Sequence, residues 1–187
     1  NVTGVQTCAL PIFNASTSPT TGIITTADSS GALALQSNGT TALTINSDAS
    51  TTLASYQTIK SLIETATITA SAPSSTTNFD VITQAVQYYT SNTANNWTLN
   101  IRGNSSTSLN TLMSTGQVIT ITMIVTNSST AYYQSALQID GSSVTPKWQG
   151  GTAPSSGNAS ALDVYTYAIV KTGSATFTVF ASQTKFA

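Results

Sequence analysis

The chain has no histidine, a single cysteine at Cys8, and few charged side chains. Asp, Glu, Lys and Arg together make up 6% of the residues, whereas soluble domains usually carry about 25%. Without histidine, catalysis by a Ser-His-Asp or Cys-His arrangement is excluded, and the commonest zinc ligand is missing. No apolar run approaches the roughly 18 residues of a membrane-spanning helix. The sequence therefore offers little basis for thiol, imidazole or zinc chemistry.

Basic residues are equally scarce, and the formal net charge is −1. The five of them are scattered along the chain rather than clustered: Lys60, Arg102, Lys147, Lys171 and Lys185. A groove that follows a phosphate backbone, or a face that binds an acidic membrane, needs clustered positive charge. We therefore expect neither a nucleic-acid nor a membrane partner.

A pair of carboxylates, as in glycan hydrolysis, is the remaining catalytic option. The candidates are Asp28, Asp48, Glu64, Asp80, Asp140 and Asp163. Asp28 and Asp140 fall in turns with serine or glycine, where aspartate commonly serves backbone geometry. Asp80 and Asp163 stand where predicted strands begin. A glycine-rich phosphate loop is also missing, since no Lys-Ser/Thr follows Gly150-Gly151. We expect no catalytic residues, no metal and no cofactor.

Serine and threonine are abundant and make up about a third of the chain. Such a composition is typical of disorder, but the hydrophobic content of 40% supplies apolar area that disordered segments lack. Thr, Val, Ile and Tyr favour strands, while the helix formers Glu, Lys and Arg are nearly absent. The composition predicts an all-β protein.

The first residues stand apart from the rest. Val2 to Ile12 read VTGVQTCALPI, which resembles the conceptual translation of a sequencing-library adapter joined in frame to a gene; a genuine N-terminal arm is the alternative. On the adapter interpretation, residues 1–12 are an artefact to be left out of fold reasoning. The natural N-terminus is then missing, and the rest of the chain contains no cysteine.

Residues 13–60 are expected to form a connector or stem of short strands. Candidate strands at Ile23–Thr25, Ala32–Leu35 and Leu43–Ile45 are separated by turn residues, and Asn38-Gly39 is a strong hairpin signal. Each strand offers few apolar side chains, and an isolated hairpin is marginal in water. The stem should therefore need a partner, most simply identical chains wound around one axis.

The end of this stem is ambiguous. Within Thr51–Glu64, the residues Leu53, Tyr56, Ile59 or Lys60, and Ile63 have a roughly helical spacing. A short connecting helix and a strand both remain open here.

Residues 61–187 show longer and more regular alternation, typical of half-buried strands. In one such run, Trp97, Leu99 and Ile101 share a face. The eight candidate strands are Thr65–Ala70, Phe79–Thr90, Trp97–Arg102, Ile119–Val125, Ala131–Ile139, Ser143–Trp148, Leu162–Lys171 and Thr176–Ala181. They predict an antiparallel, jelly-roll-like β-sandwich of about eight strands.

Turns and one helix complete this prediction. Turns are expected at Asp140-Gly141, Gly150-Gly151 and Thr172-Gly173. A short helix is expected at Ser108–Ser114, with Ser106 or Thr107 as its N-cap and Gly116 as its C-terminal stop.

The aromatic residues are the best candidates for ligand binding. Tyr88-Tyr89 and Tyr132-Tyr133 lie in predicted strands, so one tyrosine of each pair should face away from the core. An exposed tyrosine is a good platform for a sugar ring, since it offers an apolar face and a hydroxyl. Packing at a subunit interface is the alternative. Trp148 lies near a loop and is either a lid over the core edge or a further stacking residue.

Several stretches carry a resemblance to a known group of proteins. GIITTADSSGALALQSNGTTALTI (Gly22 to Ile45) resembles segments of tail-fibre and other virion proteins of marine tailed bacteriophages. VQYYTSN (Val86 to Asn92), RGNSSTSLNTLMSTGQ (Arg102 to Gln117), VTPKWQGGTAPSSGNAS (Val144 to Ser160) and the end of the chain from Val164 resemble a domain found at the C-termini of such proteins. The resemblance implies a virion location, trimeric assembly and a natural end at Ala187, and it carries over no catalytic residues.

The sequence thus favours a non-enzymatic fibre component that binds identical chains, other virion proteins and a host-surface glycan, with several weak sites adding up to useful avidity. A capsid decoration protein without a host ligand would have the same fold. Two further interpretations stay open: a cellular adhesin or carbohydrate-binding module, and a tail spike that hydrolyses glycans through two carboxylates.

Overall fold

The structure is a computed structural model, and it describes residues 32–37, 40–47 and 49–187. The chain divides into two compact units, Asn1–Ser61 and Leu62–Ala187. The adapter-like segment with Cys8, and the strand expected at Ile23–Thr25, lie outside the described residues.

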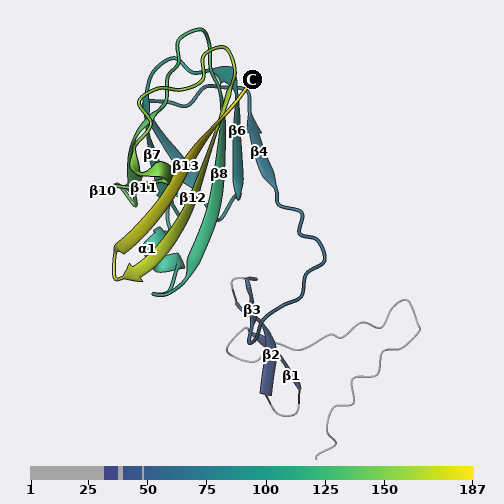
Figure 1. Cartoon of the computed structure of the whole chain (residues 1–187). Helices are drawn as coiled ribbons and strands as arrows, with labels where there is room; N and C mark the ends of the chain where they lie inside the picture. The colour runs from purple at the N-terminus through teal and green to yellow at the C-terminus, as the bar shows by residue number, and fades with distance from the viewer. Residues whose placement is uncertain (1–31, 38–39, 48) are drawn as a thin grey trace, which may run out of the picture. The chain divides into compact units, whose positions relative to one another are not determined.

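Three short strands form the sheet of the first unit: β1 (Leu33–Ser37), β2 (Thr40–Ile45) and β3 (Thr51–Leu53), in the order β1-β2-β3 (Figure 1). Both pairings are antiparallel, and Ser37 lies opposite Thr40. This is the pairing expected around Asn38-Gly39, two residues that lie outside the described ones. All side chains described in this unit are exposed or half-buried, so its described part lacks a core.

No helix follows β3. The chain from Ala54 to Thr65, described throughout, runs without helix or strand. The helical alternative for Thr51–Glu64 is therefore wrong, and the strand alternative holds only for β3. A short helix depends on packing of its apolar face. Here Tyr56 and Ile63 are 92% and 94% exposed, so the described residues do not provide that packing.

The second unit, residues 62–187, is described throughout and consists of two β-sheets, one short α-helix and a turn of 3-10 helix, η1 (Gln149–Gly151) (Figure 1). One sheet has four strands in the order β10-β9-β7-β5, and the other has six in the order β11-β13-β12-β8-β6-β4. The elements are β4 (Ala66–Thr69), β5 (Thr76–Asp80), β6 (Val86–Asn92), β7 (Trp97–Arg102), α1 (Leu109–Leu112), β8 (Val118–Thr126), β9 (Gln134–Ile139), β10 (Ser142–Val144), β11 (Lys147–Trp148), β12 (Leu162–Gly173) and β13 (Thr176–Phe186).

The expectation of purely antiparallel pairing is wrong, because both sheets are mixed. The parallel pairs are β4 with β6, β6 with β8, β5 with β7, β7 with β9, and β11 with β13. The reason lies in the chain path: from β4 to β9, successive strands alternate between the two sheets. Strands that are neighbours in a sheet are therefore two apart in the chain and run in the same direction. Side chains alternate with a period of two in either pairing, so local periodicity does not distinguish them.

The second unit also has ten strands rather than about eight, because two predicted strands are each broken by a turn. Phe79–Thr90 is interrupted after β5, where the carbonyl oxygen of Asp80 accepts hydrogen bonds from the backbone of Thr83 and Gln84. Ser143–Trp148 is interrupted at Thr145-Pro146 and becomes β10 and β11. In both cases the first part pairs in the four-stranded sheet and the second part in the six-stranded sheet.

One hydrophobic core receives side chains from both sheets. Trp97, Leu99 and Ile101 of β7 are fully buried, as their alternation predicted. The Trp97 ring meets Tyr165 of β12 edge-on, with 5.8 Å between ring centroids. The remaining buried hydrophobic residues are Phe79, Tyr89, Leu109, Met113, Ile121, Met123, Val125, Leu137, Ile139, Tyr167, Ile169, Val179 and Ala181.

The turns and the helix agree with the sequence in part. Asp140 and Gly141 have φ of 51° and 79° and form the expected tight β9–β10 hairpin. The β12–β13 hairpin turns at Ser174-Ala175 instead of Thr172-Gly173. Helix α1 is shorter than expected, and its N-cap is Ser108, whose hydroxyl accepts from the backbone nitrogen of Thr111 at 2.9 Å.

Candidate functional site

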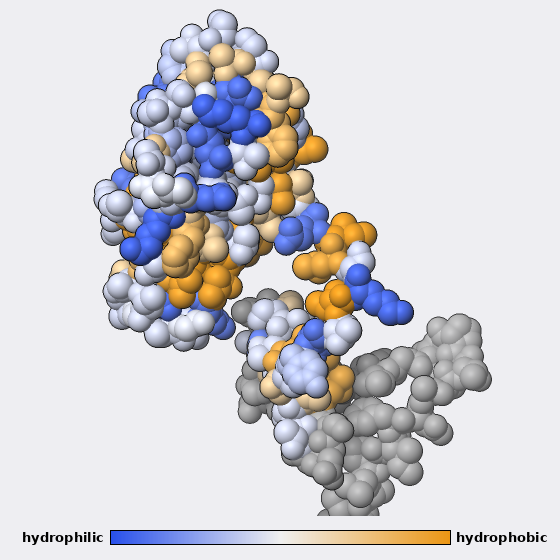
Figure 2. All heavy atoms as spheres, in the orientation of Figure 1, coloured by the Kyte–Doolittle hydropathy of each residue, from blue (hydrophilic) through white to orange (hydrophobic). Residues whose placement is uncertain are grey.

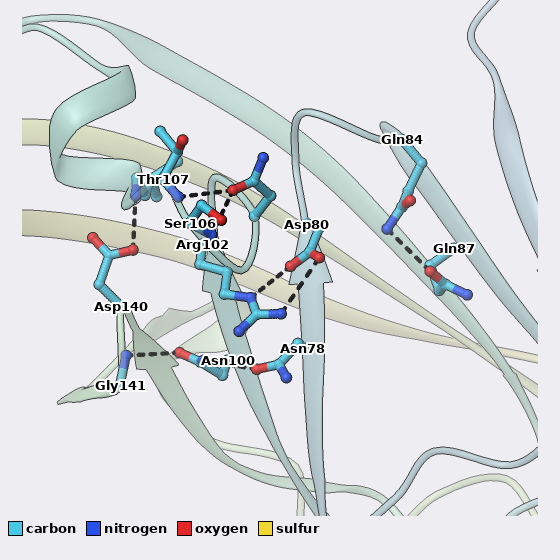
Figure 3. A network of polar contacts seen from close by, with 12 residues as sticks. Asn78, Asp80, Gln84, Gln87, Asn100, Arg102, Ser106, Thr107, Asp140 and Gly141 are labelled. Carbon is cyan, nitrogen blue, oxygen red and sulfur yellow. Dashed lines mark hydrogen bonds and ion pairs between the residues drawn. The ribbon is translucent and has the colours of Figure 1, made fainter.

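The outer face of the four-stranded sheet carries a ladder of amide side chains. Asn78, Asn100 and Gln138 occupy paired positions on β5, β7 and β9. The Nδ2 of Asn100 donates to Oδ1 of Asn78 at 2.8 Å, and its Oδ1 accepts from the backbone nitrogen of Gly141 at 2.9 Å (Figure 3). Asn100 is buried, so these bonds satisfy an amide that would otherwise be costly to remove from water.

An ion pair lies two residues further along the same strands. Arg102 donates from Nε to Oδ1 of Asp80 at 2.6 Å and from Nη2 to Oδ2 at 3.4 Å (Figure 3). The hydrogen bond to Asp80 raises the pKa of the Arg102 guanidinium, while desolvation opposes the shift. No hydrogen bond occupies Nη1 of Arg102 among the described residues. The guanidinium is thus held in place with one nitrogen available.

A shallow groove of about 380 Å³ opens beside this pair. The loop after β7 forms one wall, in which Oδ1 of Asn104 accepts from the backbone nitrogens of Ser106 at 2.8 Å and Thr107 at 2.7 Å. The full lining is Asn100, Arg102, Asn104, Ser105, Ser106, Thr107, Ser108, Asp140 and Gly141. Almost every group here offers a hydroxyl, amide or charge, which suits a polyhydroxylated ligand better than an apolar one.

Of the aromatic residues predicted to bind a ligand, Trp148 is the one that lines grooves. It lies half-buried at the end of the edge strand β11, and its ring meets Tyr167 edge-on at 6.4 Å. On one side it borders a groove of about 310 Å³ with Ser143, Thr145 and Ala153. On another side it borders a polar groove that includes Gln183 and Lys185. An aromatic surface beside hydrogen-bonding groups is an arrangement that can hold a sugar ring.

The four predicted tyrosines are spread over the molecule. Tyr89 belongs to the core, and its burial raises the pKa of its phenol. Tyr88 faces the opposite side of β6, beside Ile68 and Ile124 on the neighbouring strands. Tyr132 and Tyr133 precede β9 rather than lying in it, and both are half-buried. None of the four lines the grooves described here, so the structure does not gather the predicted aromatics into one site.

The Arg102 groove is the part of the surface that sequence reasoning missed. The signal was present, because Asn78 and Asp80 share one face of β5, and Asn100 and Arg102 share one face of β7. What the sequence did not reveal was that these two strands are neighbours, since β6 lies between them in the chain.

Three of the described carboxylates, Asp80, Asp140 and Asp163, each serve a local structural contact. Asp80 pairs with Arg102. Asp140 accepts from the backbone nitrogens of Leu109 at 2.7 Å and Asn110 at 2.9 Å. Glu64 lies exposed, whereas Asp28 and Asp48 lie outside the described residues. Within the described part of the chain, no three His, Cys, Asp or Glu side chains come together in a way that could hold a metal ion.

Asp163 is the buried member of this set. Its Oδ2 accepts from Nδ2 of Asn127 at 2.7 Å and from the backbone nitrogen of Asn158 at 2.9 Å. Burial raises the pKa of the Asp163 carboxyl, and the hydrogen bonds from Asn158 and Asn127 oppose the shift. The side chain thereby fastens the loop before β12 to the end of β8.

Comparison of the chain with models of protein families, with curated proteins and with solved structures finds no match in any of the three. In the described residues, no helix has the length and apolar character to cross a membrane.

Proposed function

We propose that this chain is a structural component of a bacteriophage fibre, which assembles as a homotrimer through its first unit and the residues just after it, and displays the sheets of its second unit on the virion surface. The observation that carries the proposal is the apolar segment that begins at the end of β3 and stops just before β4. From Leu53 to Ile63, five large hydrophobic side chains are exposed. They are Leu53, Tyr56, Ile59, Leu62 and Ile63.

Such exposure is costly for a chain that remains single. Burying a side chain of this size contributes roughly 1.5–3 kcal/mol, and contiguous apolar surface on a soluble protein usually marks an interaction site. Identical chains are the simplest partner, because the same apolar segment is then present on every copy and the copies cover one another. The sheet of the first unit, which has no buried side chain among its described residues, gains a core in the same way.

The second unit suits the role of a displayed head. We propose that its two sheets, which share one core, form a jelly-roll-like sandwich with mixed pairing. Trp148 and the grooves beside it would then bind a glycan of the host surface. Three copies on one fibre would turn weak single sites into useful avidity.

The test is the native mass of the chain from Phe13 to Ala187, measured by light scattering after chromatography. We expect a trimer. Replacing Tyr56, Ile59 and Ile63 together by serine should yield folded monomers, whereas serine at Gln57, Thr58 and Lys60 should leave the trimer intact. A folded monomer for the unaltered chain would overturn the proposed assembly.

A further inference from the structure

The outward side chains of the six-stranded sheet form straight rows across five strands. Strand pairing places Ile68, Tyr88, Ile124, Val164 and Thr184 in one line, on β4, β6, β8, β12 and β13 in turn. Side chains alternate along each strand, so the residues directly before and after these in the chain point to the core side of the sheet. The row therefore belongs to the surface that faces away from the core.

This outer face carries no charge on any of these five strands, all of which are described. Its members are Ala66, Ile68, Val86, Tyr88, Thr90, Val118, Thr120, Thr122, Ile124, Thr126, Leu162, Val164, Thr166, Ala168, Val170, Thr176, Thr178, Phe180, Ser182, Thr184 and Phe186. More than half are hydrophobic and nearly all the others are threonine. The first charged residue next to these strands is Lys147 of the edge strand β11, which lies opposite Phe180.

The two sheets therefore expose different chemistry. The four-stranded sheet presents Asn78, Asp80 and Arg102 to solvent, and these polar and charged groups stay hydrated at low cost. The six-stranded sheet presents aliphatic and threonine side chains, with Ile68 69% and Phe180 50% exposed. Figure 2 shows hydrophobic residues gathered along β4 and β6 and again near the lower ends of β12 and β13. A sheet with one solvated face usually has polar residues on it, so this face departs from that pattern.

The face is large enough for a specific interface. Five strands spaced about 4.8 Å apart, with outward residues along about nine positions at about 3.3 Å each, span roughly 600–700 Å². In the proposed trimer three such faces would meet around one axis and bury roughly 1,800–2,100 Å² in all, comparable to the range of about 1,200–2,000 Å² for stable protein interfaces.

The edges of this sheet are poorly suited to adding strands from another chain. β11 has two residues, follows Pro146 and carries Lys147, while β4 has four residues. Short edges with proline or lysine are how natural sheets avoid edge-to-edge pairing. Association through this sheet therefore uses its face.

We propose that the outer face of the six-stranded sheet packs against a second copy of this chain. The inference rests on the proposed function in one respect, the association of copies through the segment from Leu53 to Ile63. Only two residues separate Ile63 from Ala66, the first residue of β4, and each residue spans at most about 3.6 Å. Copies joined at Ile63 therefore start β4 close together. β4 is the edge of this same face, and its outward Ile68 continues the series of exposed apolar residues.

A single introduced thiol tests the proposal on the full chain. Cys8 is replaced by serine so that the only thiol is that of Ala168→Cys, at the centre of the face, or that of Ser105→Cys, on the loop beside the Arg102 groove. These are called the face thiol and the loop thiol below. Labelling with a polar thiol reagent is followed while the native mass is measured on the same sample. In the assembled protein we expect the face thiol to react at least about tenfold more slowly than the loop thiol, as buried sites are protected relative to exposed ones.

A charged residue supplies the second readout. Thr166→Lys on the face should restore fast labelling of the face thiol, whereas Gln138→Lys on the other sheet should leave its protection unchanged. An assembled protein in which the face thiol and the loop thiol react equally fast would refute the face contact and leave the proposed trimer standing. Protection of the face thiol that persists when Tyr56, Ile59 and Ile63 are serine would support the face and refute assembly through that segment. A monomer with fast labelling would overturn both.

Discussion

Asp140 and Lys171 hold the opposite ends of helix α1, and each reaches the helix from a different sheet. Asp140, directly after β9, accepts from the backbone nitrogens of Leu109 and Asn110 at 2.7 and 2.9 Å. Lys171 of β12 donates from Nζ to the carbonyl oxygens of Asn110 at 2.5 Å and Met113 at 2.8 Å. A helix of four residues is not stable alone. Here a carboxylate satisfies its first amides and an ammonium its last carbonyls, in the orientation that the helix dipole favours.

Replacing Lys171 by methionine tests how much this clamp contributes. The methionine fills a similar volume but leaves the carbonyls of Asn110 and Met113 without their buried donor. We expect the free energy of unfolding, measured by urea denaturation, to fall by about 2–3 kcal/mol. Lys147→Met, at an exposed position of β11, should change it by less than about 0.5 kcal/mol. Equal effects of the two substitutions would show that Lys171 contributes little through α1.

The clamp also illustrates what local sequence does and does not determine. Alternation predicted that Trp97, Leu99 and Ile101 face the core, because a period of two follows from strand geometry alone. Composition likewise indicated an all-β protein. The bonds that fix α1 join residues 31 and 61 positions apart, so they depend on strand order. The Asp80–Arg102 pair arises in the same way, from the parallel pairing of β5 with β7, which the period does not reveal.

Gly157 is required by a close approach of backbone and side chains. A Cβ at this position would lie 2.1 Å from the carbonyl oxygen of Tyr132 and 2.7 Å from Oδ2 of Asp163. Gly157→Ala should therefore displace the loop before β12 and lower the free energy of unfolding by about 1–3 kcal/mol, as overpacking does. Gly173→Ala is the matched control, since its Cβ would make only ordinary contact with Thr176 at 3.6 Å. A thermal or urea denaturation curve of Gly157→Ala that matches the control would contradict this role.

Asp163 makes the free energy of unfolding depend on pH in the direction opposite to that of a carboxylate stabilised by a salt bridge. Burial raises the pKa of this carboxyl above its ordinary value of 3.8, so the folded protein binds the proton more tightly than the unfolded chain. Its contribution to stability is therefore fully present below the unfolded pKa and is lost as the pH rises through the folded pKa. Asp163→Asn keeps an oxygen that can accept from Asn127 and Asn158 but does not ionise.

We expect Asp163→Asn to remove this part of the pH dependence. Urea denaturation at a series of pH values from neutral to acid should show a flatter profile for the variant, with a free energy of unfolding at neutral pH no lower than that of the unaltered chain. A large loss of stability at neutral pH, recovered in acid, would show instead that the ionised carboxylate is needed by Asn127 and Asn158.

Trp148 is the residue whose removal should separate glycan binding from assembly. Its ring borders grooves that carry Ser143, Gln183 and Lys185, so a bound sugar ring would lie against the indole while its hydroxyls meet these polar groups. Loss of an aromatic residue at the centre of a binding site typically costs about 2 kcal/mol or more. On an array of bacterial surface polysaccharides, Trp148→Ala should therefore bind at least about tenfold more weakly than the unaltered chain, with the native mass unchanged.

Arg102→Gln, in the separate groove on the four-stranded sheet, is the comparison. If Arg102→Gln loses glycan binding and Trp148→Ala keeps it, the glycan site lies in the groove beside Asp80. An array that captures neither the unaltered chain nor any variant would leave a virion component without a glycan ligand as the better account.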